Sequence, residues 1–111
     1  MNFLYLSSDK MGEGDPELGR KLLLIFLEKL ADSDVTVDVV GCVNNGILLT
    51  TTPNGPALPA LQKLAARGAR IVTCGTCLDH HGRRDLLQIG EVGGMDGTVQ
   101  IMATADRVIR P

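Results

Sequence analysis

Short apolar runs rich in β-branched residues alternate with segments of helical periodicity along the whole chain, and this alternation limits the possible fold more than any other feature. Five runs are expected to form strands: Phe3 to Leu6, Val35 to Val40 leading into Gly41-Cys42, Arg70 to Thr73, Glu91-Val92 and Val108-Ile109. Helices are expected over Pro16 to Ala31, from Leu58 until Gly68, over Leu78 to Leu87 in broken form, and over Asp96 to Thr104. Strands that alternate with helices pair in parallel, and the helices cover both faces of the sheet. The sequence therefore predicts an α/β fold with a mainly parallel sheet of about five strands.

The first helix has the clearest boundary signals. Asp15 is a good N-cap and Pro16 suits the first helical position. Apolar residues then recur at helical spacing, at Leu18, Leu22, Ile25, Phe26 and Leu30. The run Ile47 to Thr52 fits a strand and a helical turn equally well, so it is left without an assignment.

Length and composition indicate one ordinary soluble domain. The chain has 111 residues and no internal repeat or linker, so residues 1–111 are expected to form a single domain. A net charge of -2 with scattered basic residues gives no reason to expect nucleic acid or an anionic membrane as a partner. The N-terminus lacks the regions of a signal peptide, and the longest apolar run, Leu22 to Leu27, is far too short to cross a bilayer. A cytoplasmic location is expected.

The chemistry of the chain is concentrated in the turn Cys74-Gly75-Thr76-Cys77. Three cysteines, of which two form a C-x-x-C pair, do not make a secreted disulfide framework, so they indicate reactive thiols in a reducing compartment. Cys74 directly follows a strand and precedes a helical turn, where unpaired backbone N–H groups favour the thiolate. Gly75 permits the tight backbone, and Cys77 is placed to resolve a mixed disulfide or persulfide. His80 and His81 lie one turn further on and could tune the local charge.

Other interpretations of the cysteines stay open at this point. They could be small buried core residues, and a thioredoxin-like redox site has the same C-x-x-C spacing, although that motif normally follows an early strand. Zinc would take Cys74, Cys77 and one of the two histidines, but a fourth ligand is missing unless Cys42 approaches. We expect no metal. No cofactor is expected either, because the loop at Gly12-Glu13-Gly14 has Glu17 where a dinucleotide fingerprint needs glycine.

The carboxyl ends of parallel strands meet at one edge of a sheet, where α/β proteins bind ligands. Four segments are expected at this edge: Ser7-Ser8-Asp9, Cys42-Val43-Asn44, Cys74 to Cys77, and Gly93-Gly94-Met95. The predicted site therefore combines the two catalytic thiols with supporting residues from the neighbouring strand ends. These supporting residues are Asn44, Asn45, Gly75, Thr76, Gly94 and Met95.

Three stretches of the chain resemble the DsrE/DsrF-like family, and most of all the C-terminal DsrE-like domain of the YedF proteins. They are Ser8-Asp9 with Gly12 to Gly19, Val43 to Ile47 with Leu49-Thr50, and Cys74-Gly75-Thr76-Cys77-Leu78-Asp79. The resemblance continues through Val92 and Met95 to Pro111. It implies a three-layer α/β/α fold, a homo-oligomer, and a sulfur-handling role for the cysteine after the third strand. In sulfur-relay relatives this position carries a persulfide, and the matching residue is Cys74. A link to selenium metabolism is also implied.

The chain departs from the YedF pattern at two points. A TusA-like domain usually precedes this one, whereas here the sequence starts at the DsrE-like strand, so a TusA-like sulfur donor is expected to act in trans. After the fourth strand the family tends to have Asn-Met-Tyr, and this chain has Gly94-Met95-Asp96. The expected function is sulfur relay, with Cys74 carrying sulfane sulfur between donor and acceptor proteins. The alternatives are a non-catalytic oligomeric scaffold with structural or zinc-binding thiols, and a Cys74–Cys77 disulfide switch.

Overall fold

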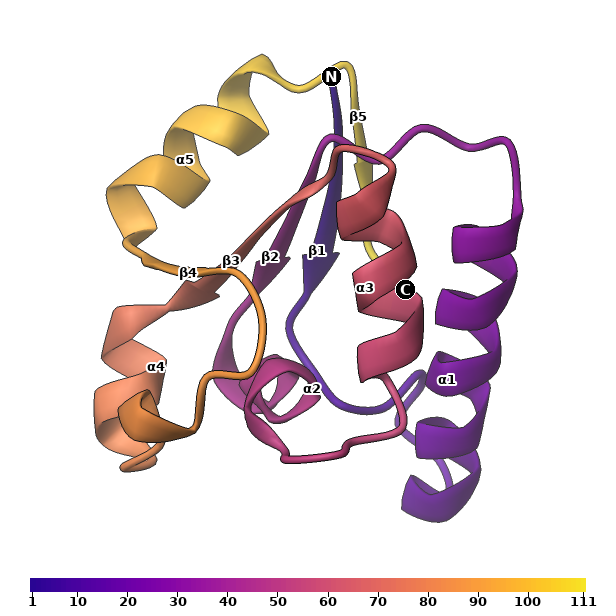
Figure 1. The fold of residues 1–111 in the computed structure, drawn as a ribbon, viewed down its shortest axis with the longest axis vertical. Helices are drawn as coiled ribbons and strands as arrows, with labels where there is room; N and C mark the ends of the chain where they lie inside the picture. The colour runs from indigo at the N-terminus through magenta and orange to yellow at the C-terminus, as the bar shows by residue number, and fades with distance from the viewer.

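A computed structural model describes all residues, 1–111, and shows an α/β fold built on one five-stranded sheet (Figure 1). The strands are β1 (Asn2–Leu6), β2 (Val39–Cys42), β3 (Arg70–Cys74), β4 (Glu91–Gly93) and β5 (Arg107–Ile109). Their order in the sheet is β4-β3-β2-β1-β5, and every pairing is parallel. The predicted fold class and the five predicted strands are confirmed. All carboxyl ends therefore lie at one edge, the lower one in Figure 1.

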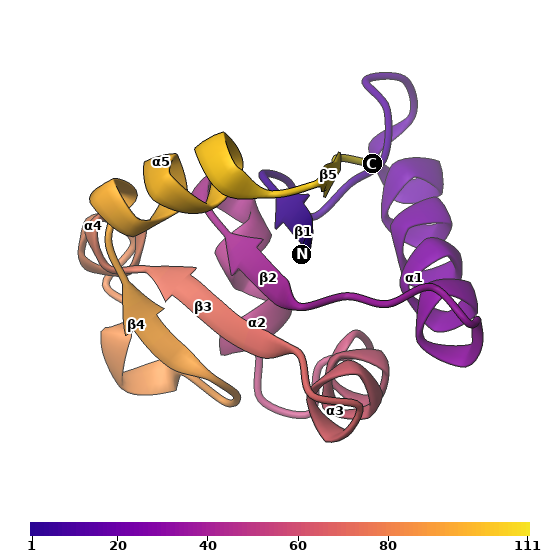
Figure 2. The same ribbon diagram turned by 90° about the horizontal axis from the view of Figure 1, so that it is seen from above.

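Helices cover both faces of the sheet, which gives three layers (Figure 2). On one face lie α1 (Pro16–Asp32), α2 (Leu48–Thr51) and α3 (Leu58–Ala66), whereas α5 (Met95–Thr104) lies alone on the other. The main core forms on the first face, where α1 and α3 pack on alternate residues of the central strands. Its sheet residues include Leu4, Val40 and Ile71. The face under α5 is more thinly covered, since no residue of α5 is buried.

The predicted second strand starts too early. Residues 35–38 are not part of the strand, which begins at Val39. Side chains bind the carbonyl groups of this segment. Arg67 Nη2 donates to the Val35 carbonyl at 2.8 Å, and Asn2 Nδ2 donates to the Thr36 carbonyl at 2.8 Å. The β-branched residues Val35 and Thr36 therefore form an exposed connection from α1 into the sheet.

The unassigned run at 47–52 proves to be helical. A 3₁₀ turn, η1 (Asn44–Ile47), leads directly into the short helix α2. Thr50 and Thr51 are fully buried, and both hydroxyls donate to the Ile47 carbonyl, at 3.2 and 2.7 Å. Thr50 Oγ1 also lies 2.8 Å from Thr73 Oγ1 of β3. These hydrogen bonds satisfy hydroxyl groups that would otherwise be costly to bury, and they attach α2 to the strand that precedes the cysteine pair.

The broken helix predicted around Gly82 is also present. α4 (Gly75–His80) ends before Gly82, which has a φ of +62°, and the 3₁₀ turn η2 (Arg84–Leu86) follows. Glycine adopts this left-handed conformation at no steric cost, so the chain can reverse there. The reversal brings the chain back along α4 before it enters β4.

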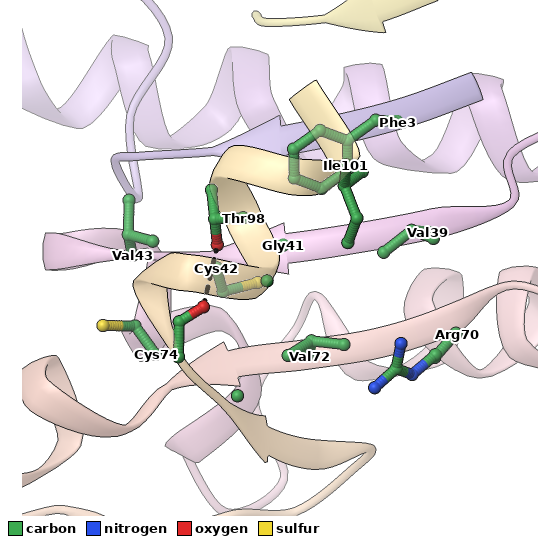
Figure 3. A pocket seen from close by; sticks show the side chains of 13 residues that line it. Phe3, Val39, Gly41, Cys42, Val43, Arg70, Val72, Cys74, Thr98 and Ile101 are labelled. Atoms are coloured by element: carbon green, nitrogen blue, oxygen red, sulfur yellow. Dashed lines mark hydrogen bonds between the residues drawn. The ribbon is translucent and has the colours of Figure 1, made fainter. Parts of the chain in front are cut away.

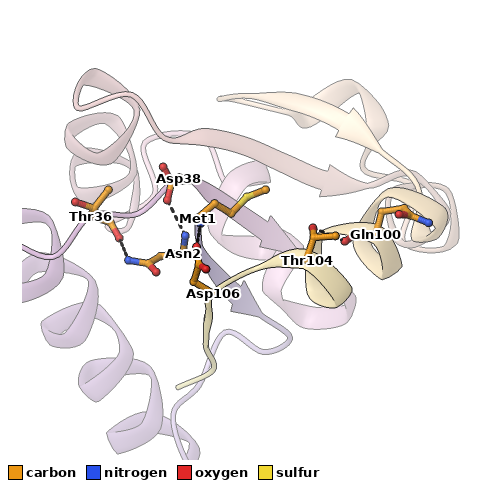
Figure 4. A network of polar contacts seen from close by, with 7 residues as sticks. All are labelled: Met1, Asn2, Thr36, Asp38, Gln100, Thr104 and Asp106. Carbon is orange, nitrogen blue, oxygen red and sulfur yellow. Dashed lines mark hydrogen bonds and ion pairs between the residues drawn. The ribbon is translucent and has the colours of Figure 1, made fainter.

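Polar contacts close the amino edge of the sheet around β1 (Figure 4). The Met1 amino group pairs with Asp106, just before β5, and this hydrogen bond raises the pKa of the amino group. The Asn2 backbone N–H donates to Asp38 Oδ2 at 2.6 Å. β1 is thus held to the segments that precede both of its neighbours. No helix of the chain is both long enough and apolar enough to cross a membrane.

Candidate functional site

Cys74 ends β3 and caps the amino end of α4. Its Sγ accepts the backbone N–H of Cys77 at 3.4 Å, and its extended backbone (φ −61°, ψ 121°) turns directly into the helix. Gly75 follows in a tight space, because an added Cβ would lie 3.1 Å from Arg84 Nη2 and from Val92 Cγ1. A backbone N–H at the start of the helix is thus directed at the sulfur. This is the placement predicted from the sequence.

Cys77 interacts with both the first cysteine and the end of β2. Its Sγ accepts the Asn44 backbone N–H at 3.2 Å, and Asn44 has a φ of +50°, a conformation that asparagine tolerates better than most residues. Burial raises the pKa of the Cys77 thiol, a hydrogen bond with the Cys74 sulfur raises this pKa further, and the Asn44 N–H partly offsets both effects. Cys77 is therefore a thiol at neutral pH, and it can donate its S–H to Cys74 Sγ.

Cys74 lines a small cavity beneath α5 (Figure 3). The cavity has a volume of about 90 Å³ and lies between the sheet and the helix, with Thr98 and Ile101 of α5 opposite the strands. Phe3 and Gly41 form part of its floor. A Cβ at Gly41 would lie 2.8 Å from the Phe3 ring, so only glycine leaves enough space for the ring. The cavity is larger than a water molecule needs, so a small group fits beside Cys74.

Cys77 faces a separate and more open hollow. This hollow has a volume of about 460 Å³, and its lining includes Asn44, Thr76, Met95 and the two histidines, His80 and His81. The histidine rings contact each other edge to face, with 5.0 Å between their centroids. The two cysteines of one turn therefore face different spaces, one enclosed and one accessible.

The predicted site residues are only partly brought together. Gly94 joins Cys74 in the small cavity, and Asn44, Thr76 and Met95 join Cys77 in the hollow. Asn45 is exposed and lines neither space. Of the four strand ends expected to converge, the one after β1 lines neither thiol space. The reason is the strand order, because β2 lies between β1 and β3.

Arg84 braces the cysteine turn, a role that could not be predicted from the sequence. Its Nε donates to Asp79 Oδ1 at 2.8 Å and its Nη2 donates to the Gly75 carbonyl at 3.4 Å. The guanidinium holds the pKa of the Asp79 carboxyl below its usual value. The two residues meet because the chain reverses at Gly82. Opposite charges on both sides of a glycine were the only available hint.

Cys42 lines the small cavity together with Cys74, as the position of its strand end predicts, but its side chain turns to the other face of the sheet. It pairs in register with Thr73, so its side chain shares the α1–α3 face of the sheet and belongs to the main core. Cys74 follows Thr73 and points to the opposite face. The cluster needed for a zinc site does not form, as no three Cys, His, Asp or Glu residues are grouped to hold a metal.

Cys42 should make the fold sensitive to alkali. Burial raises the pKa of its thiol from 9.0 to about 12. The unfolded chain releases this proton near pH 9 while the folded chain keeps it, so this contribution to stability is complete below pH 9 and is lost as the pH rises toward 12. Between pH 8 and pH 10 the wild type should lose about 1.4 kcal/mol more unfolding free energy than Cys42→Ala. Urea unfolding at the two pH values measures this difference, and parallel losses in both proteins would contradict it.

Comparisons with known proteins agree with this architecture. The sequence profile of the DsrE/DsrF-like family matches residues 35–111. Two solved structures resemble the whole chain: the YchN protein from E. coli (TM-score 0.63, 18% identity) and MTH1491 from Methanobacterium thermoautotrophicum, a protein of unknown function (TM-score 0.69, 21% identity). In each case 99% of this chain and 97% of the other chain are covered. At these identities the likeness concerns the fold alone. No curated protein matches the sequence.

Proposed function

Since the chain belongs to the DsrE/DsrF-like family, we propose that it is a sulfur carrier in which Cys74 holds sulfane sulfur as a persulfide and passes it to a partner protein. One observation carries this proposal: Cys74 Sγ accepts a backbone N–H at the start of α4, and Cys74 stands at the border of the small cavity beneath α5. The family resemblance of the Cys74-Gly75-Thr76-Cys77-Leu78-Asp79 stretch points to the same residue.

The transfer needs no external oxidant or reductant. The Cys74 thiolate attacks the outer sulfur of a donor persulfide, the sulfur–sulfur bond of the donor breaks, and the donor leaves as a thiolate. The new Cys74 persulfide then gives its outer sulfur to an acceptor thiolate in the same way, which restores Cys74. Each step exchanges one sulfur–sulfur bond for another.

Cys77 serves as the tuning or resolving thiol. Because its pKa is raised, Cys77 keeps its proton, and its S–H can donate a hydrogen bond to Cys74 Sγ. It can also attack the Cys74 sulfur of the persulfide, which forms a Cys74–Cys77 disulfide and releases hydrosulfide. That second route would make the disulfide switch a side branch of the same chemistry.

A sulfur adduct tests the proposal. Reduced protein incubated with glutathione persulfide should gain the mass of one sulfur atom, and fragmentation should place it on Cys74. Cys77→Ser should still form the adduct, whereas Cys74→Ser should lose it, at least about a hundredfold, because its hydroxyl is not ionised at neutral pH. Circular dichroism of both variants controls for folding. An unmodified wild type, or an undiminished adduct in folded Cys74→Ser, would exclude the persulfide.

The more specific assignments rest on the resemblance to the YedF proteins. They are a TusA-like protein as donor, a cytoplasmic setting in which all three cysteines stay free, and a link to selenium metabolism. A selenium adduct on Cys74 after incubation with selenite and glutathione, in the same mass assay, would extend the carrier role from sulfur to selenium.

Association into a homo-oligomer is part of the same proposal. Three apolar side chains on the outer side of α5 are exposed: Met95 (54%), Val99 (57%) and Met102 (37%). They recur at helical spacing and form one stripe. A second copy packed on this stripe would remove it from water and press α5 onto the cavity of Cys74. An oligomeric scaffold without sulfur chemistry is the alternative function. The adduct assay distinguishes it from a sulfur carrier.

A further inference from the structure

A third hollow lies on the α1 side of the sheet, away from both thiols. Its volume is about 410 Å³, within the range of small-molecule sites, and none of its lining residues lines either thiol space. It is found beyond the carboxyl end of β1, between α1 and α2 (Figure 1). Ligands of open α/β sheets bind beyond the carboxyl ends of the strands.

Asp9 lines this hollow, and one of its two carboxylate oxygens has no partner. Its Oδ2 accepts from Arg20 Nε at 3.2 Å, but its Oδ1 is buried and has no hydrogen-bond partner. No other buried side-chain oxygen or nitrogen of the chain lacks a hydrogen-bond partner. Buried polar groups nearly always have partners, and an unpaired one costs free energy. The position therefore favours a ligand that brings a hydrogen-bond donor.

Two arginines in the same lining present free donors. Arg83 is fixed on α2, as its Nε donates to Thr51 Oγ1 at 2.7 Å and its Nη2 to the Thr51 carbonyl at 2.9 Å. Its Nη1 makes no hydrogen bond within the chain, and Arg20 uses only its Nε. A guanidinium with free N–H groups pairs well with a carboxylate. The remaining wall is apolar and includes Leu24, Leu48 and Ala57.

We propose that this hollow binds a small zwitterion of the α-amino acid type. The ammonium group pairs with the Asp9 carboxylate, the ligand carboxylate accepts from Arg83 and Arg20, and a short apolar side chain lies against Leu24 and Leu48. A simple amine would leave both arginines unmatched, and a simple carboxylate would bring no donor to Asp9. The site is independent of the sulfur chemistry at Cys74.

L-norleucine is a suitable probe, because it has both charged groups and an unbranched apolar chain but no sulfur. Hexanoate and 1-aminopentane have the same chain with one charged group each. In an NMR titration of the wild type, norleucine should bind saturably with a dissociation constant in the millimolar range or below, and at least about tenfold more tightly than either control. The largest amide shifts should fall at Asp9 and at residues 48–57, with little change at Cys74 and Cys77.

Asp9→Asn should weaken norleucine binding at least about tenfold, since one carboxylate oxygen becomes an N–H donor that faces the ammonium group. Asp34→Asn removes an exposed carboxylate elsewhere and should bind as the wild type does. If Asp9→Asn does not fold, the positions of the wild-type amide shifts still show whether norleucine binds in this hollow. The proposal fails if norleucine does not saturate, if either control binds equally well, or if the shifts cluster at the thiols.

Discussion

Gly46→Ala is expected to destabilise the fold by at least about 3 kcal/mol, or to prevent folding. An added Cβ at this position would lie 2.0 Å from the Leu6 carbonyl oxygen and 2.8 Å from its carbon. Both are backbone atoms at the end of β1, so no side-chain rotation can relieve the clash. η1 would have to move away from the sheet and take with it Asn44, whose N–H binds Cys77 Sγ. Urea unfolding measures the loss.

Gly97→Ala is the matched control. Gly97 lies within α5, and an added Cβ there meets nothing within 4 Å. Alanine is a better helix former than glycine, so this variant should gain about 0.5–1 kcal/mol. The two variants add the same methyl group, and only the surroundings differ. Equal changes in both unfolding free energies would mean that the close approach of η1 to β1 is not real.

Leu27→Ala should cost about 2–5 kcal/mol. Leu27 is fully buried on the face of α1 that packs into the main core, so the truncation loses apolar burial and leaves a cavity. Leu22→Ala on the same helix is the control, because Leu22 is 41% exposed and the change should cost less than about 1 kcal/mol. The midpoints of thermal or urea unfolding compare the two. Similar costs would contradict the orientation of α1 on the sheet.

The order of strands and helices was predictable because each element has its own local signal. The Asp15 side chain does cap α1, accepting from Glu17 and Leu18, and Gly68 does follow α3 with a positive φ. The segment at 35–38 shows where such signals fail. Its β-branched residues favour a strand, but Asn2 and Arg67, distant in sequence, bind its carbonyls. The local sequence pattern carries no information about such distant contacts.

The candidate site was predictable to the level of the strand end but not of the side-chain direction. Cys74 lies at the end of β3 as expected, and Thr76 and Gly94 do line the thiol spaces. Cys42 ends the adjacent strand and lines the cavity with Cys74, also as expected. The direction of its side chain was not predictable: Cys42 is paired with Thr73, one residue before Cys74, and successive residues point to opposite faces. Such a one-residue offset depends on the whole sheet.

The contact between Arg84 and Asp79 had no comparable local signal. The pair depends on how sharply the chain reverses at Gly82, and a glycine in a sequence allows many turn geometries. The burial of Asp9 Oδ1 without a partner also had no signal in the local sequence.

The separation of the two thiol spaces has a practical consequence for chemical labelling. Cys74 is only 8% exposed and lies under α5, while Cys77 borders an open hollow. A bulky thiol reagent should therefore reach Cys74 less easily than Cys77. If Cys74 carries the proposed persulfide, the same restriction limits its loss to thiols other than the partner's, and a partner protein has to shift α5 to reach it.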